Sequence, residues 1–144
     1  MELSFRRLDP EATLPAAQNA GDAGLDLRAT VDVEVLPGER AMIQTGVAVA
    51  IPEGHAGLVL PRSGLASKRG LTLANSPGLI DAGYRGEVMV AAVNLDRTEA
   101  VKIARGDRVA QLVVVALPVV EPAWVGELPA TQRGEGGFGS TGSS

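Results

Sequence analysis

The sequence predicts an all-β fold of the sandwich, jelly-roll or barrel type, with one short helix. Glycine (18 residues) and proline (9 residues) are abundant in the 144-residue chain, which favours many short strands over long helices. Apolar and polar residues alternate with a period of two, most strictly in residues 31–35, as in strands with one solvated face. Turn signals recur about every 8–12 residues, the spacing typical of such folds.

The expected strands lie between these turn signals. Residues 23–28 can form a first strand, and the alternation at 31–35 predicts a second, which ends at the turn signal Pro37-Gly38. The remaining strands are expected at residues 42–51 (as one strand or two), 58–60, 71–73, 87–94 and 108–115.

One helix is expected, over residues Ser63–Arg69. Ser63 can cap its first turn, and Leu65 and Ala66 favour helical backbone. Gly70 stands where a left-handed C-terminal cap belongs. The helix would therefore be only one or two turns long.

Composition excludes several classes of protein. The length fits one domain, and 45% hydrophobic with 21% charged residues is an ordinary globular mixture. A net charge of −4 favours neither a nucleic acid nor an anionic membrane as partner. With no cysteine and one histidine, disulfides, thiolate metal sites and histidine-rich zinc sites are excluded. Aromatic residues make up 3%, so we expect an aliphatic core.

The two ends of the chain bear on its location and domain organisation. Met1–Pro10 has no apolar stretch of signal-peptide length, and the longest apolar run, residues 112–120, is too short to cross a bilayer. We therefore expect a cytoplasmic protein with no membrane partner. Residues 133–144 hold five glycines and few apolar groups, which predicts a flexible segment after a β-domain of residues 1–132.

The segment Pro61-Arg62-Ser63-Gly64-Leu65 is the first candidate site. A serine at a helix start, followed by glycine, exposes backbone N–H groups at the positive end of the helix dipole. That arrangement suits a phosphate, and Arg62 adds a cation beside it. The alternative is a plain helix cap next to a surface arginine.

The second candidate, residues 75–87, looks like a hairpin with an acid near its tip. Leu79 and Ile80 lead into Asp81, and a glycine-containing turn follows. Asp81 could be a general base for a water molecule. It could equally be a turn aspartate that binds its own backbone.

Two further residues are candidates because of their setting. Asp26 lies between leucines and could face either solvent or a cation, whereas Gln111 is a polar residue on the face of Val109 and Val113. Two apparent motifs are rejected. Residues 134–139 match G-x-G-x-x-G as text, but no strand precedes them and too few residues follow for a helix. His55 lies in an expected exposed turn.

Taken together, five segments resemble the five ordered motifs of the homotrimeric deoxyuridine triphosphatase (dUTPase) family. They are residues 23–29, 61–66, 78–87, 106–111 and 133–142. One motif alone would be weak, but five in order, ending in Arg-Gly-Glu-Gly-Gly-Phe-Gly-Ser-Thr-Gly, are specific and span nearly the whole chain. The resemblance implies a jelly-roll-like β-barrel and a homotrimer with shared active sites, in which residues 133–144 act as a lid.

The resemblance also implies the reaction. The chain would hydrolyse dUTP to dUMP and pyrophosphate, which keeps dUTP low and supplies dUMP for thymidylate synthesis. Asp81 would activate the water that attacks the α-phosphate, Asp26 would hold Mg²⁺ through water, and Tyr84 would exclude a 2′-hydroxyl. The remaining residues implied to bind the phosphates or the uracil are Arg62, Ser63, Gly64, Asn75, Gly78, Leu79, Ile80, Met89, Gln111, Arg133, Phe138, Gly139 and Ser140.

Two other functions fit the sequence less well. A dCTP deaminase of the same fold would need a catalytic glutamate where this chain has Ala91, so deamination would lack its proton shuttle. A non-catalytic, nucleotide-binding jelly-roll trimer would be expected to lose the acid or the tail, and both are present. Residues 119–131, including Trp124, match no motif.

Overall fold

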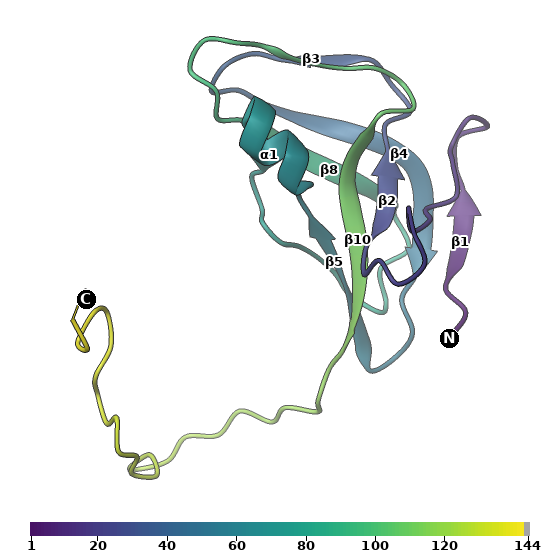
Figure 1. Ribbon diagram of the computed structural model, residues 1–144. Coiled ribbons are helices and arrows are strands. Elements are labelled where there is room, and N and C mark those ends of the chain that lie inside the picture. Colours follow the sequence, from purple (N-terminus) through teal and green to yellow (C-terminus); the bar gives the residue numbers. More distant parts are fainter. Residues whose placement is uncertain (143–144) are drawn as a thin grey trace.

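The computed structural model describes residues 1–142, which fold into an all-β body with one short helix (Figure 1). The elements in chain order are β1 (Ser4–Arg7), β2 (Leu25–Arg28), β3 (Val33–Val35), β4 (Arg40–Ala50), β5 (His55–Leu60), α1 (Ser63–Arg69), β6 (Leu71–Leu73), β7 (Gly78–Ile80), β8 (Glu87–Asn94), β9 (Val101–Ile103) and β10 (Arg108–Ala116). The predicted all-β class with one short helix is confirmed.

Long-range antiparallel pairing builds the sheets. One sheet has the order β1-β4-β8-β6, a second has the order β2-β10-β5-β7, and β3 and β9 form a separate two-stranded ribbon. The pairing of β4 with β8 shifts register between Gln44 and Ala48, which marks a bulge. Residues 42–51, expected as one strand or two, thus belong to the single strand β4 and the short turn after it.

The core is aliphatic, as expected from the low aromatic content. Its largest fully buried apolar side chains are leucine, isoleucine and valine, among them Leu27, Ile43 and Leu112. Asn94 is buried too, but its amide donates to the carbonyls of Val35 and Glu99 at 2.9 and 2.8 Å. These bonds offset the cost of burying a polar group.

The cap expected at the start of α1 is wrong by one residue. Arg62 is the N-cap, with extended backbone (φ −89°, ψ 126°) and no side-chain cap hydrogen bond. Ser63 already has helical backbone, so its hydroxyl is not placed to cap the first turn. Gly70 does end the helix in the left-handed conformation, with φ 72°.

The expected hairpin over residues 75–87 is not a paired hairpin. Its first arm, β7, pairs with β5, whereas its second arm, β8, pairs with β4 and β6. The segment therefore crosses from one sheet to the other, and Asp81 lies in the connection. His55 is also placed differently from the expectation, because it begins β5 and is partly buried rather than lying in an exposed turn.

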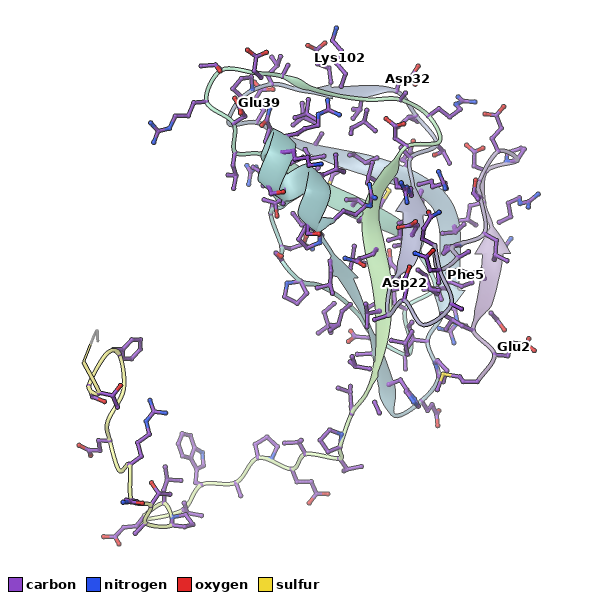
Figure 2. The ribbon with its side chains drawn as sticks, in the orientation of Figure 1. Glu2, Phe5, Asp22, Asp32, Glu39 and Lys102 are labelled. Carbon is purple, nitrogen blue, oxygen red and sulfur yellow. The ribbon has the colours of Figure 1, made fainter. Side chains whose placement is uncertain are left out.

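Two strands and the course of the C-terminal segment were not apparent from the sequence. Neither β1 nor β9 was predicted from the sequence. After β10, residues 117–142 form neither helix nor strand and lead away from the body (Figure 1). Trp124 and Phe138 are fully exposed on this segment, whose side chains stand clear of the body in Figure 2. Within residues 1–142, no helix is long and apolar enough to span a membrane.

Candidate functional site

An apolar hollow of about 240 Å³ opens between β7, β8 and the neighbouring strands. Six of the residues predicted to bind substrate line it: Asn75, Gly78, Leu79, Ile80, Tyr84 and Met89. Met42, Val59, Glu87 and Val88, which the sequence did not single out, complete the lining. The hollow thus has apolar walls with a few polar groups, the usual character of a small-molecule site.

Asn75 and Tyr84 have fixed places in this apolar hollow. A Cβ atom on Gly78 would lie 3.3 Å from the amide nitrogen of Asn75, so glycine leaves room for that side chain. At the other end, the Tyr84 hydroxyl donates to the carbonyl of Glu87 at 2.9 Å. The amide of Asn75 and the ring of Tyr84 are therefore placed at opposite ends of β7.

Asp81 lies in a turn but does not behave as a turn aspartate. Its carbonyl accepts the N–H of Tyr84 at 3.0 Å, yet its exposed carboxylate makes no hydrogen bond to any described residue. The carboxylates of Asp9, Asp96 and Asp107, by contrast, each accept a nearby backbone N–H. A side-chain bond to the turn backbone therefore does not explain this aspartate, and the Asp81 carboxylate is available to a ligand or a water.

A second, polar hollow of about 380 Å³ lies where β2, β10 and the start of α1 meet. Five predicted residues line it: Asp26, Arg62, Ser63, Gly64 and Gln111. The others are Gln18, Asn19, Asp22, Ala23, Gly24 and Arg108. Two guanidinium groups among polar side chains suit a polyphosphate.

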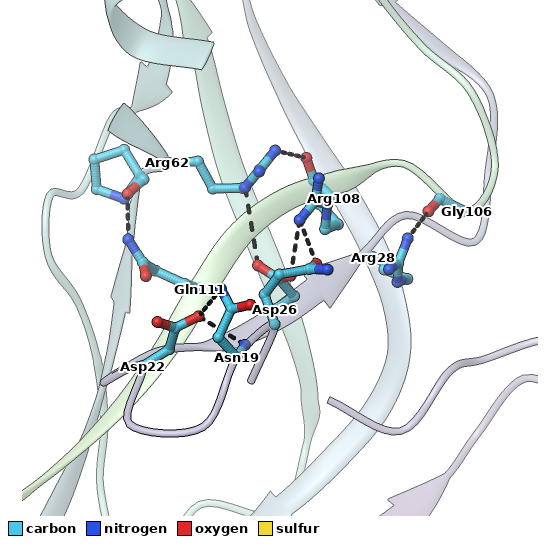
Figure 3. Close-up of polar contacts among 10 residues, drawn as sticks. Asn19, Asp22, Asp26, Arg28, Arg62, Gly106, Arg108 and Gln111 are labelled. Atoms are coloured by element: carbon cyan, nitrogen blue, oxygen red, sulfur yellow. Dashed lines mark hydrogen bonds and ion pairs between the residues drawn. The ribbon is translucent and has the colours of Figure 1, made fainter. Parts of the chain in front are cut away.

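Asp26 lies between the two arginines of the polar hollow (Figure 3). Its carboxylate is 3.4 Å from Nη1 of Arg108 and 3.9 Å from Nε of Arg62, and its side chain is only 17% exposed. Asp26 thus lies in the expected strand, and of its two possible orientations, toward solvent or toward a cation, it adopts the second. Arg108 also donates to Oε1 of Gln18 at 2.6 Å, which ties the loop before β2 to β10.

Arg108 is the main residue of the polar hollow that sequence reasoning missed. Its own carbonyl accepts a hydrogen bond from Arg62 at 3.3 Å, so both arginines and Asp26 form one network. The signal was available, because Arg108 lies three residues before Gln111 in the same motif-like segment.

Gln111 reaches the polar hollow from β10. Its amide donates to the carbonyl of Pro61 at 3.0 Å, which joins β10 to the start of α1. A Cβ on Gly24 would collide with Oε1 of Gln111, so glycine at this position leaves room for the Gln111 side chain as it lies here. Gln111 is thus polar, although its strand is otherwise apolar, because its side chain lines the polar hollow.

The donor set of the polar hollow bears on metal binding. Within residues 1–142, no group of three or more histidine, cysteine, aspartate or glutamate side chains could enclose a metal ion. Asp22 and Asp26 are the carboxylates that line the hollow. This set fits Mg²⁺ bound chiefly by phosphate oxygens and water, with a protein carboxylate in outer contact.

The two hollows are separate half-sites on one chain. They share no lining residue, and Asp81 lines neither. β7 runs antiparallel to β5 with Ile80 beside Gly57, so Asp81 lies near the start of β5, whereas Arg62 follows its end. About six strand residues separate them, or roughly 20 Å.

The predicted residues of the tail join neither hollow. Arg133 donates to the carbonyl of Gly136 at 2.6 Å, and Ser140 donates its N–H to Gly137 at 3.1 Å. These bonds are local turns within the exposed segment. The structure therefore leaves Arg133, Phe138, Gly139 and Ser140 away from both hollows, and residues 143–144 lie outside the described part of the chain.

Known proteins resemble this chain along its length. The family model for dUTPase matches residues 10–142. The deoxyuridine 5'-triphosphate nucleotidohydrolase of Streptomyces coelicolor is 57% identical over 99% of this chain and 78% of its own length.

Solved structures of dUTPases are also similar to this chain. A variant of the Staphylococcus bacteriophage 80alpha dUTPase, solved with dUpNHpp, superposes with a TM-score of 0.92 at 32% identity over 99% of both chains. A dUTPase variant of phage phi11 of S. aureus, whose structure concerns the coordination of a structural Mg(II) ion, has a TM-score of 0.83 at 32% identity. That match covers 90% of this chain and 100% of the other.

Proposed function

The chain belongs to the dUTPase family, and from this premise we propose how its two half-sites divide the family reaction between them. The reaction is hydrolysis of dUTP to dUMP and pyrophosphate, which keeps dUTP low and supplies dUMP for thymidylate synthesis. One observation carries the proposal: the predicted residues separate into an apolar hollow and a polar, arginine-lined hollow. The first suits a nucleoside and the second a triphosphate.

The apolar hollow is proposed to hold deoxyuridine. Asn75 and the backbone of β7 offer donors and acceptors to the uracil edge, so that cytosine, with its exchanged donor and acceptor, is rejected. The ring of Tyr84 packs on the deoxyribose and leaves no room for a 2′-hydroxyl. The preference for dUTP over dCTP and UTP follows from these two contacts.

The polar hollow is proposed to hold the phosphates. Arg62 and Arg108 supply charge, Gln111 an amide, and Ser63 with Gly64 the first N–H groups of α1. Asp26 would hold Mg²⁺ through water, and the bound ion would offset charge on the phosphates. Negative charge develops on the departing pyrophosphate during the reaction, and the arginines stabilise that charge as well.

Asp81 is proposed as the general base. Its carboxylate takes a proton from a water molecule while the water oxygen attacks the α-phosphorus. The bond from that phosphorus to the bridging oxygen breaks, and pyrophosphate leaves with the electron pair. The exposed carboxylate, without a bond to any described residue, supports this role.

The separation of the half-sites supports a homotrimer. Because Asp81 and Arg62 lie at opposite ends of β5, a second copy of the chain is proposed to bring its polar hollow to the apolar hollow of the first. A ring of three closes such a head-to-tail contact. The tail of residues 133–144 would then serve as a lid, with Arg133 on phosphate and Phe138 on uracil.

The proposed compartment is the cytoplasm, since the substrate is a DNA-precursor nucleotide. The test of function is pyrophosphate release from dUTP in the presence of Mg²⁺, with dCTP and UTP as comparison substrates. We expect rapid release from dUTP alone. Ammonia release from dCTP, or no pyrophosphate from dUTP, would refute the proposal.

A further inference from the structure

We propose that Glu87 is a positioning residue for sugar selectivity. Its carboxylate binds the bulge in β4, and this bond fixes the backbone that holds Tyr84 at the edge of the apolar hollow. The inference rests on the proposed function, because it concerns how that same site distinguishes deoxyribose from ribose.

The anchor of this arrangement is the β4 bulge. Where pairing with β8 shifts between Gln44 and Ala48, backbone groups lose their ladder partners. The N–H of Gly46 donates instead to Oε1 of Glu87 at 2.8 Å. Gly46 is buried and closely packed, since a Cβ there would lie 2.7 Å from the Cβ of Asp9. Glu87 is thus tied to a closely packed point of the sheet.

Gly86 and Glu87 hold the Tyr84 ring in place. Its hydroxyl donates to the carbonyl of Glu87 at 2.9 Å. A Cβ on Gly86 would lie only 2.7 Å from Cζ of Tyr84, so the ring rests directly against the glycine backbone. Tyr84 and Glu87 both line the apolar hollow. The position of the ring therefore depends on the backbone at residues 86–87, which the bond to Gly46 holds together with the pairing of Glu87 to Ala48.

Removing the carboxylate should loosen the ring. In Glu87→Ala, the Gly46 N–H loses its acceptor, and the backbone that holds the Tyr84 hydroxyl keeps only the pairing of Glu87 with Ala48 in β4. We expect the ratio of kcat/KM for UTP to that for dUTP to rise by about tenfold or more. Glu87→Gln keeps an Oε1 acceptor for the same N–H and should restore the native ratio.

The experiment measures kcat and KM for dUTP and UTP on these variants, together with thermal unfolding. Tyr84→Ala gives the ratio for a fully removed ring. Asp96→Ala is the matched control, because its carboxylate also accepts backbone N–H groups but lies in a turn away from both hollows. We expect Asp96→Ala to lower stability without changing the ratio.

A second variant protects the test against a failure to fold. Gly86→Ala keeps the Glu87 bond but pushes the Tyr84 ring aside, and it should raise the UTP ratio as well. The inference is overturned if Glu87→Ala and Gly86→Ala both keep the native ratio, or if Glu87→Gln fails to restore it. In each of those cases the native protein would still hydrolyse dUTP, whereas loss of that activity from the native protein would instead overturn the proposed function.

Discussion

The exchange Gly64→Ala separates the stability of α1 from its role in binding phosphate. Gly64 is the second residue of the helix, and apart from its chain neighbours and the helix backbone no described atom lies within 4 Å of the position its Cβ would take. Alanine favours a helix over glycine by about 0.5–1 kcal/mol. The free energy of unfolding should therefore rise by about that amount, since the new methyl group meets no obstacle in the chain.

The same methyl group would project beside the polar hollow that Gly64 helps to line. A phosphate that approaches the first N–H groups of α1 would then be held off. We expect kcat/KM for dUTP to fall at least about tenfold, equivalent to about 1.4 kcal/mol of lost binding. Gly64→Ala should thus make a more stable and less active protein.

Thermal unfolding and steady-state pyrophosphate release measure the two effects separately. Ala66→Gly, in the same helix but outside the lining of the hollow, is the matched control and should lower stability while keeping activity. Full activity in Gly64→Ala would show that Gly64 does not face the phosphates. A loss of stability in Gly64→Ala would show that the space beside it is filled.

Three further changes test other parts of the account. Asp81→Asn should lower turnover by about 10²–10⁴-fold, while calorimetry should show that a non-hydrolysable dUTP analogue still binds. Near-native turnover would show that Asp81 is only a turn residue. Deleting residues from Arg133 onward should leave folding and assembly intact by sedimentation but slow hydrolysis steeply, and equal activity would contradict the lid. The N–H groups of Glu99 and Thr98 lower the pKa of Asp96. The ionised carboxylate therefore stabilises the fold at pH values above its usual titration range. This stabilisation is lost as the pH falls through the lowered pKa. The stability difference between the native protein and Asp96→Asn, followed by denaturant unfolding, should therefore shrink below about pH 4; a constant difference would refute it.

Strands with a strong apolar pattern were predictable from the sequence alone. β8 was expected with its observed bounds, because residues 88–93 form one apolar run. β1 was not, since Ser4–Arg7 contains one apolar residue and two arginines and pairs with β4 only at the sheet edge. Local composition carries little information about a strand whose stability comes from its partner.

The site was predictable in its residues but not in their arrangement. The motif-like segments identified Asp26, Arg62 and Gln111, which the structure brings together. They did not reveal Arg108 as the residue that joins them, because that network depends on contacts between residues far apart in the chain. Nor could they show that β7 and β8 belong to different sheets, since strand pairing at long range leaves no local pattern.

The central claim is that each active site combines half-sites from different chains, and mixing two inactive variants tests it most directly. Asp81→Asn lacks the proposed base and Arg62→Ala lacks a phosphate ligand, so each alone should be nearly inactive. If the chains are unfolded together and reassembled at random, about a quarter of the sites receive an intact Asp81 from one chain and an intact Arg62 from another. The account predicts recovery of about that fraction of the native rate. A mixture no more active than its two components would contradict it, because sites contained within one chain cannot be repaired by a neighbour.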